Sequence, residues 1–103
     1  MKLLTKEIIK ALPPLHSTDN VPLENKMVIC KFFAPWTNWT WFVFEAEKQE
    51  DEDYLFFGMV HGFTKESGYF HFSELASLQG PFGLTIERDR FLFKLSYHLC
   101  SWR

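Results

Sequence analysis

Cysteines, glycines and long apolar runs are all scarce in this sequence, and each shortage excludes a class of protein. The two cysteines, Cys30 and Cys100, lie far apart and match no metal-binding spacing, so we expect reduced thiols. The five glycines are scattered and form no phosphate-binding loop. The longest stretch free of charge and proline, residues 36–44, is too short for a membrane helix.

The first residues contain no apolar segment of the kind that opens a signal peptide, so we expect a cytoplasmic protein with no membrane partner. Aromatic residues, by contrast, are abundant. They make up 18% of the 103 residues, and hydrophobic residues make up 47%. This composition predicts one globular domain over residues 1–103 that holds its core without a metal or a disulfide. We expect no cofactor.

Local patterns predict two short helices in an otherwise strand-rich chain. The first covers residues 6–12, with Thr5 as N-cap, and ends at Pro13-Pro14. The second covers residues 74–78 and is capped by Ser73.

Strands are predicted at residues 27–33, 39–47, 54–62, 69–72 and 91–99, with turns at 34–38 and 64–68, where Gly68 supplies a positive φ. The strand at 39–47 is apolar on both faces, which is typical of the middle of a covered sheet. Alternation places Trp39, Trp41 and Val43 on one face, and Phe42, Phe44 and Ala46 on the other. The fold class is therefore α+β, an antiparallel sheet of about four or five strands with two short helices.

The sequence contains no motif of a known kind of catalytic site. There is no Gly-x-Ser-x-Gly elbow, and neither cysteine lies in an electropositive context, so we expect no enzyme. His61 and His71 are the nearest approach to a metal site, because a turn at 64–68 would place them opposite each other. No third ligand accompanies them, and we interpret them as two half-exposed histidines of a sheet.

Charge is distributed unevenly although the net charge is only −2. Residues 45–53 contain six acids, namely Glu45, Glu47, Glu50, Asp51, Glu52 and Asp53, against the single cation Lys48. This predicts one acidic hairpin loop on a mildly basic body. Such a loop is usually solvated, yet it also suits protein docking, and fixed negative charge can occupy a site meant for nucleic-acid phosphates.

Several blocks together resemble a family of small bacterial proteins described only as a domain of unknown function. They are Lys31-Phe32-Phe33-x-Pro35, Asn38-Trp39-Thr40-Trp41, Gly68-Tyr69-Phe70, Ser73-Glu74-Leu75 and Leu84-x-Ile86-Glu87-Arg88-Asp89, after an opening Leu4 to Glu7 and Pro13-Pro14-Leu15. The resemblance covers roughly residues 3–91. It implies a gene common on plasmids, prophages and other mobile elements, and brings no catalytic residues. The apolar tail at 91–103 departs from the family pattern.

Two main functional hypotheses remain open, beside a third, a metal-dependent enzyme that uses His61 and His71. The first is a non-enzymatic protein of a mobile element or phage that binds a host protein, in its sharpest form inhibiting a CRISPR or restriction system. The second is an accessory protein that binds single-stranded nucleic acid through exposed aromatics and through Lys31, Arg88, Arg90, Lys94 and Arg103. The absence of a basic stripe disfavours it. The predicted partner-binding residues are Trp36, Asn38, Glu50, Asp51, Glu52, Asp53, Arg88 and Arg90. The chain is expected to be a monomer, or a homodimer through strand 91–99.

Overall fold

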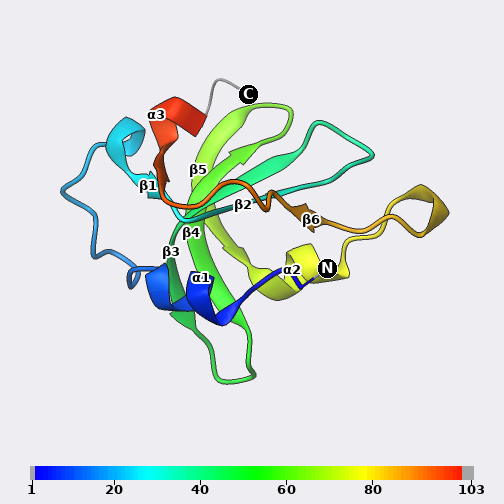
Figure 1. The fold of residues 1–103 in the computed structure, drawn as a ribbon, viewed down its shortest axis with the longest axis horizontal. Helices are drawn as coiled ribbons and strands as arrows, with labels where there is room; N and C mark the ends of the chain where they lie inside the picture. Colours follow the sequence, from blue (N-terminus) through cyan, green and yellow to red (C-terminus); the bar gives the residue numbers. More distant parts are fainter. Residues whose placement is uncertain (1, 101–103) are drawn as a thin grey trace.

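A five-stranded antiparallel sheet organises the computed structural model, which describes residues 2–100 (Figure 1). Its strands run in the order β5 (Lys65–His71), β4 (Tyr54–His61), β3 (Thr40–Lys48), β2 (Cys30–Phe33) and β6 (Glu87–Arg88). A second, two-stranded sheet pairs β1 (Met27–Val28) with β7 (Leu95–Ser96). The predicted α+β class is confirmed.

Short helices pack on both faces of the five-stranded sheet. The α-helices are α1 (Lys6–Ala11), α2 (Phe72–Ser77) and α3 (Tyr97–Cys100), and single 3₁₀ turns lie at η1 (Leu23–Asn25) and η2 (Pro81–Gly83). The prediction of two short helices therefore missed α3. Within residues 2–100, no helix is long and apolar enough to cross a membrane.

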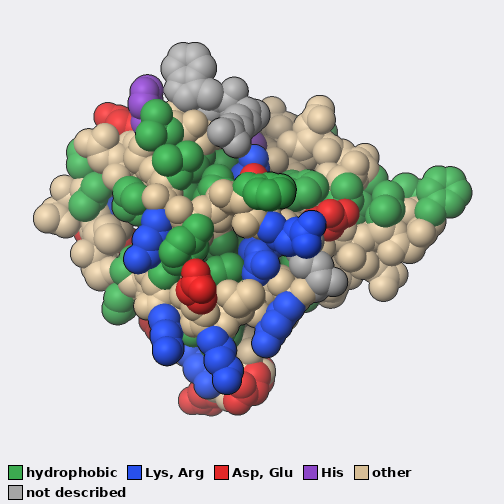
Figure 2. Space-filling model, in the orientation of Figure 1, with side chains coloured by type: hydrophobic (Ala, Val, Ile, Leu, Met, Phe, Trp, Pro, Cys, Tyr) green, Lys and Arg blue, Asp and Glu red, His purple; other side chains and the backbone are tan. Residues whose placement is uncertain are grey.

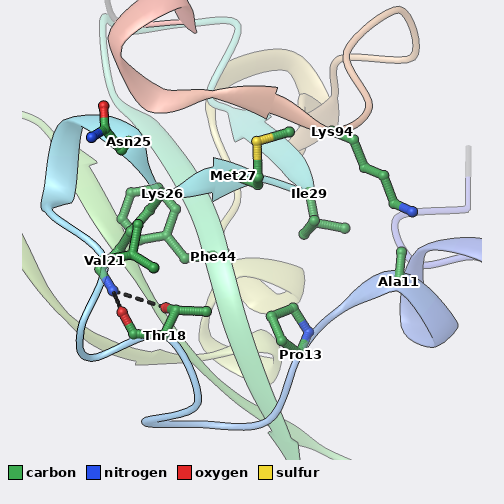
Figure 3. A pocket seen from close by; sticks show the side chains of 10 residues that line it. All are labelled: Ala11, Pro13, Thr18, Val21, Asn25, Lys26, Met27, Ile29, Phe44 and Lys94. Atoms are coloured by element: carbon green, nitrogen blue, oxygen red, sulfur yellow. Dashed lines mark hydrogen bonds between the residues drawn. The ribbon is translucent and has the colours of Figure 1, made fainter.

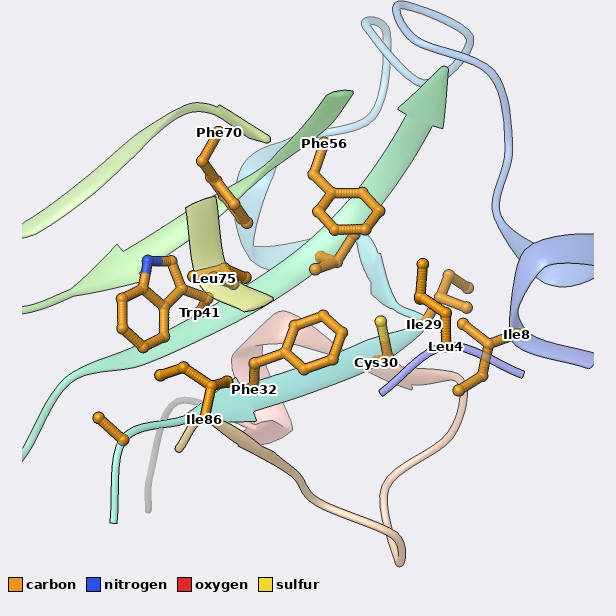
Figure 4. Close-up of a cluster of buried hydrophobic side chains, with 12 residues drawn as sticks. Leu4, Ile8, Ile29, Cys30, Phe32, Trp41, Phe56, Phe70, Leu75 and Ile86 are labelled. Atoms are coloured by element: carbon orange, nitrogen blue, oxygen red, sulfur yellow. The ribbon is translucent and has the colours of Figure 1, made fainter. Parts of the chain in front are cut away.

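Helix α1 begins where the sequence predicts. The Thr5 hydroxyl accepts a hydrogen bond from the Ile8 amide at 3.2 Å, which satisfies one of the unpaired donors of the first turn. The helix ends at Ala11, before the two prolines. Its buried residue, Ile8, packs together with Leu4 against the sheet (Figure 4). The cap and the apolar face together fix where the chain meets the sheet.

The central position of β3 is confirmed, and each of its faces is buried in a separate core. Trp41 and Val43 pack under α1 and α2 with Phe32, Phe56 and Leu75 (Figure 4). The opposite face carries Phe42 and Phe44, which pack with Met59 of β4 and against Val28 of the smaller sheet and Tyr97 and Cys100 of α3. A strand with two dry faces explains why the run is apolar at consecutive positions.

A β-bulge at Phe44 shifts the pairing of β3 with β4, since Val43 lies opposite Gly58 but Glu45 lies opposite Phe57. One extra residue reverses the alternation of faces beyond it. Ala46 therefore packs with Trp41 and Val43, not with Phe44, which corrects the predicted alternation. The bulge also turns Glu45 inward onto the face of Phe44.

Glu45 is consequently not part of the acidic loop, which corrects the charge pattern inferred from the sequence. Its side chain is 2% exposed and lies 3.9 Å from the ammonium of Lys26, which is 8% exposed. Its carboxylate also accepts hydrogen bonds from the His16 amide at 2.8 Å, the Thr18 amide at 3.2 Å and the Thr18 hydroxyl. This Glu45 clamp holds the loop after α1 against the sheet.

The hairpin that joins β4 and β5 turns earlier than predicted. Its turn is residues 62–64, and β5 begins at Lys65, so Lys65 pairs with His61 and His71 pairs with Leu55. The predicted facing of His61 and His71 is wrong, because they lie at opposite ends of the hairpin. Gly68 lies in the middle of β5, opposite Gly58, and has no positive φ.

The predicted strand at 91–99 is wrong. Only Leu95–Ser96 is a strand, in the smaller sheet, and α3 follows at once with Tyr97 buried and Phe91 exposed. The alternating apolar residues there belong to a two-residue strand, β7, and to the single turn of α3. The strand through which a homodimer was predicted is therefore absent. The predicted strand at 27–33 is likewise two strands, separated at Ile29.

Candidate functional site

Three tryptophans from the β2–β3 hairpin line an open groove of about 320 Å³. Trp36 lies in the turn, Trp39 precedes β3 and Trp41 lies within it. Ala34, Thr37 and Leu78, the last at the end of α2, complete the lining. Trp41 is buried, whereas Trp36 and Trp39 are half-buried and Leu78 is 40% exposed. We call this surface the tryptophan groove.

Glycines fix the orientation of two of these rings. A Cβ at Gly80 would lie 2.3 Å from the Trp36 ring, and one at Gly62 would lie 2.5 Å from the Trp39 ring. Each indole therefore rests against backbone that no larger residue permits. The walls of the groove are held in place before any partner arrives, which lowers the entropy lost on binding.

The rim of the groove extends onto Phe63, the tip of the β4–β5 turn. Phe63 is 95% exposed and meets Trp39 edge to face, with ring centroids 5.5 Å apart. On the other side of Trp39 is a polar hollow lined by Lys31, Asn38 and Thr40, among others. The predicted binding residues Trp36 and Asn38 therefore share one turn but line two adjoining hollows.

The acidic loop exists, but its four predicted binding residues differ in their surroundings. Glu50, Asp51 and Glu52 are exposed at the tip of the β3–β4 hairpin. Asp53 instead turns back and accepts hydrogen bonds from the amide and hydroxyl of Ser73, at 2.9 and 2.7 Å. The Ser73 hydroxyl is the main cause of a lowered Asp53 pKa. Asp53 thus anchors the start of α2.

Ser73 is accordingly not the helix cap that the sequence predicts. The N-cap is His71, whose amide donates to the Glu74 carboxylate at 2.9 Å. The His71 Nδ1 lies 3.4 Å from Asp53. Within residues 2–100, no three His, Cys, Asp or Glu side chains gather into a metal site.

Arg88 and Arg90 belong to a third surface, beside α1. The Arg88 guanidinium donates to the Leu3 carbonyl at 3.3 Å, and both arginines line a shallow hollow with Thr5 and Glu7. Figure 2 shows Lys and Arg side chains gathered over α1 and the chain beside it, above the acidic loop at the bottom of the view. Arg88 thus positions α1 as well as contributing charge.

The eight predicted binding residues therefore do not form one site. The tryptophan groove and the acidic tip lie at opposite ends of β3, Thr40–Lys48, which at ~3.3 Å per residue are about 26 Å apart. Sequence reasoning missed Leu78 in the groove and Phe63 beside it. The available signal was that both are apolar residues in segments rich in turn formers, where a buried position is not expected.

Other titratable groups contribute to the fold. His61 Nε2 lies 2.6 Å from the Tyr97 hydroxyl, which joins β4 to α3. Burial, together with Lys65 and Lys31, lowers the pKa of His61. Burial raises the pKa of the Cys30 thiol to about 12, so this group is not a nucleophile in the folded protein.

Comparison with known families assigns the chain. A family described as "Protein of unknown function (DUF2958)" matches residues 3–103, and the chain belongs to it. The match includes the tail, so the expectation that the tail departs from the family is wrong. Comparison with curated proteins and with solved structures finds no match.

Proposed function

We propose that the chain is a non-enzymatic binding module whose tryptophan groove receives an apolar side chain of a partner protein. The observation that carries the proposal is the groove itself, in which two tryptophans and Leu78 remain partly open to solvent beside the exposed ring of Phe63. Tryptophan is enriched among the residues that dominate binding energy at protein interfaces. A rigid apolar surface that is exposed to water is typical of a site where another protein binds.

The finer proposal is that the partner belongs to a host nucleic-acid defence system, such as a CRISPR complex or a restriction enzyme. It rests on the expectation, implied by the family resemblance, that such genes are common on mobile elements, and on the exposed acidic tip formed by Glu50, Asp51 and Glu52. Defence proteins bind phosphates through cationic surfaces, and an acidic tip would be attracted to such a surface. The groove would then supply the apolar contact and the tip the electrostatic one.

The test expresses the chain in a bacterium with an active CRISPR or restriction system and measures plaquing by a targeted phage. The proposal predicts that the wild type restores plaquing and that Trp36→Ala, with Leu78→Ser as a second variant, abolishes the effect. Phe82→Ser is the matched control, because Phe82 is fully exposed but does not line the groove. A wild type that never restores plaquing contradicts the finer proposal.

The broader proposal is tested separately with the same variants as affinity baits. A partner that binds the wild type and Phe82→Ser, but neither Trp36→Ala nor Leu78→Ser, supports the groove. Partners retained equally by all four baits contradict it. Truncation of a central interface tryptophan is expected to weaken binding by at least about 2 kcal/mol, which is a factor of about 30.

A second candidate function, binding of single-stranded nucleic acid, is favoured by the surface beside α1. There the exposed cations Arg90 and Lys94 flank the exposed aromatics Phe91 and Phe93. Bases stack on exposed rings while cations contact phosphates. Two of the cations predicted for this function are not part of this surface. The Lys31 ammonium lies 5.5 Å from the centroid of the Phe42 ring, and Arg103 lies outside the described residues.

A fluorescently labelled oligothymidine tests this candidate by anisotropy at two salt concentrations. Binding that weakens with salt and is lost in Phe91→Ala, but not in the control Phe63→Ala, supports it. No binding at low salt eliminates it.

A further inference from the structure

A cavity of about 430 Å³ lies between the loop that follows α1, strand β1 and the centre of β3 (Figure 3). It shares no lining residue with the tryptophan groove. Its volume is within the range of small-molecule sites. Most of its lining is apolar and comes from Ala11, Pro13, Val21, Met27, Ile29 and Phe44.

The Glu45 clamp explains why this space stays open. The carboxylate holds the amides of His16 and Thr18, and the bulge at Phe44 points it toward the loop. These hydrogen bonds anchor the loop to β3 at Glu45, so the position of the loop over the neighbouring Phe44 ring is fixed. Preformed walls of this kind are typical of ligand sites.

The polar part of the lining favours an anion. It consists of Thr18, Asn25, Lys26 and Lys94, and among residues 2–100 no acidic side chain lines the cavity. The Lys26 ammonium is already engaged, since it donates to the carbonyl and hydroxyl of Thr18 and lies 3.9 Å from Glu45. Lys94 is exposed, and Figure 3 shows its side chain extending toward Ala11 across one side of the cavity. It is the cation that a ligand entering this cavity would meet.

The geometry points to a binding site for an aliphatic monocarboxylate, with the hydrocarbon chain in the cavity and the carboxylate at the Lys94 ammonium. The chain would contact Val21, Ile29 and Phe44, which offer no hydrogen bonds. The carboxylate would find the positive charge of Lys94 at one side of the cavity. This ligand class matches both parts of the lining, whereas a cation would be repelled by Lys94 and a polyol would not match the apolar part.

The experiment titrates the full chain with hexanoate, octanoate and decanoate by calorimetry. One saturable site is expected, with affinity rising about fourfold per buried methylene. Decanol, which has the same chain without the charge, is expected to bind more weakly than decanoate. Absence of saturable binding, or equal affinity for decanol and decanoate, overturns the proposal.

Two variants locate the site. Lys94→Asn removes the charge but tolerates the positive φ of 57° found there, and it is expected to abolish the preference for decanoate over decanol. Lys48→Asn, on the exposed hairpin, is the matched control. Ala11→Leu fills the cavity from α1 and is expected to weaken decanoate binding at least tenfold without lowering the melting temperature. Undiminished binding by Ala11→Leu overturns the proposal, because the chain then lies elsewhere.

Discussion

Replacement of Glu45 by alanine is expected to destabilise the fold by about 3–5 kcal/mol, the range found when one partner of a buried ion pair is removed. The structure shows what is lost. The Lys26 ammonium loses its counter-charge and keeps Thr18 and the face of the Phe57 ring, and the amides of His16 and Thr18 lose the carboxylate that accepts from them. A domain of this size is typically stable by about 5–15 kcal/mol, so the variant would be close to unfolding.

Urea denaturation followed by circular dichroism measures the effect. Glu47→Ala is the matched control, because Glu47 lies two residues along the same strand but is exposed, and its effect should stay within about 0.5 kcal/mol. The double variant Glu45→Met with Lys26→Met removes both charges together and is expected to be more stable than the sum of the single effects predicts. If Glu45→Ala loses no more stability than Glu47→Ala, the reasoning about the clamp is refuted.

Three further outcomes are expected. Because burial raises the Cys30 pKa to about 12, thiol reagents should modify Cys30 only after denaturant is added, and rapid labelling of the native protein would contradict its burial. The lowered pKa of Asp53 means that its charged form stabilises the fold above pH ~4, and that this stabilisation is lost as the pH falls through the lowered pKa. The urea midpoint of Asp53→Asn should therefore fall less steeply in acid than that of the wild type. An unchanged pH profile of the urea midpoint would contradict the stabilising role of the Asp53 charge. Gly80→Ala should lower the urea midpoint, because its Cβ would lie 2.3 Å from an indole ring, whereas Gly68→Ala should not, because nothing lies within 4 Å; equal effects would refute the contact.

The groove could be predicted from the sequence only in part. Trp36 was predicted to bind a partner, and it lines the groove as a half-buried side chain, like Trp39. The contribution of Leu78 depends on where α2 ends in space, which no local pattern specifies. The support of Trp36 by Gly80 likewise joins segments that are distant in the chain. Such contacts form only when two distant segments approach each other, and the glycine involved cannot be distinguished in the sequence from any other glycine.

What the sequence determined by itself is local: the Thr5 cap, the end of α1 at the prolines and the double-faced apolar strand that had to be central. Tertiary structure alone decided the pairing. A turn at 62–64 set the register that separates His61 from His71, and one extra residue at Phe44 moved Glu45 from the face of Trp41 and Val43 to the face of Phe44. The physical reason is that strand alternation has a period of two, so a single inserted residue changes which side chains are buried.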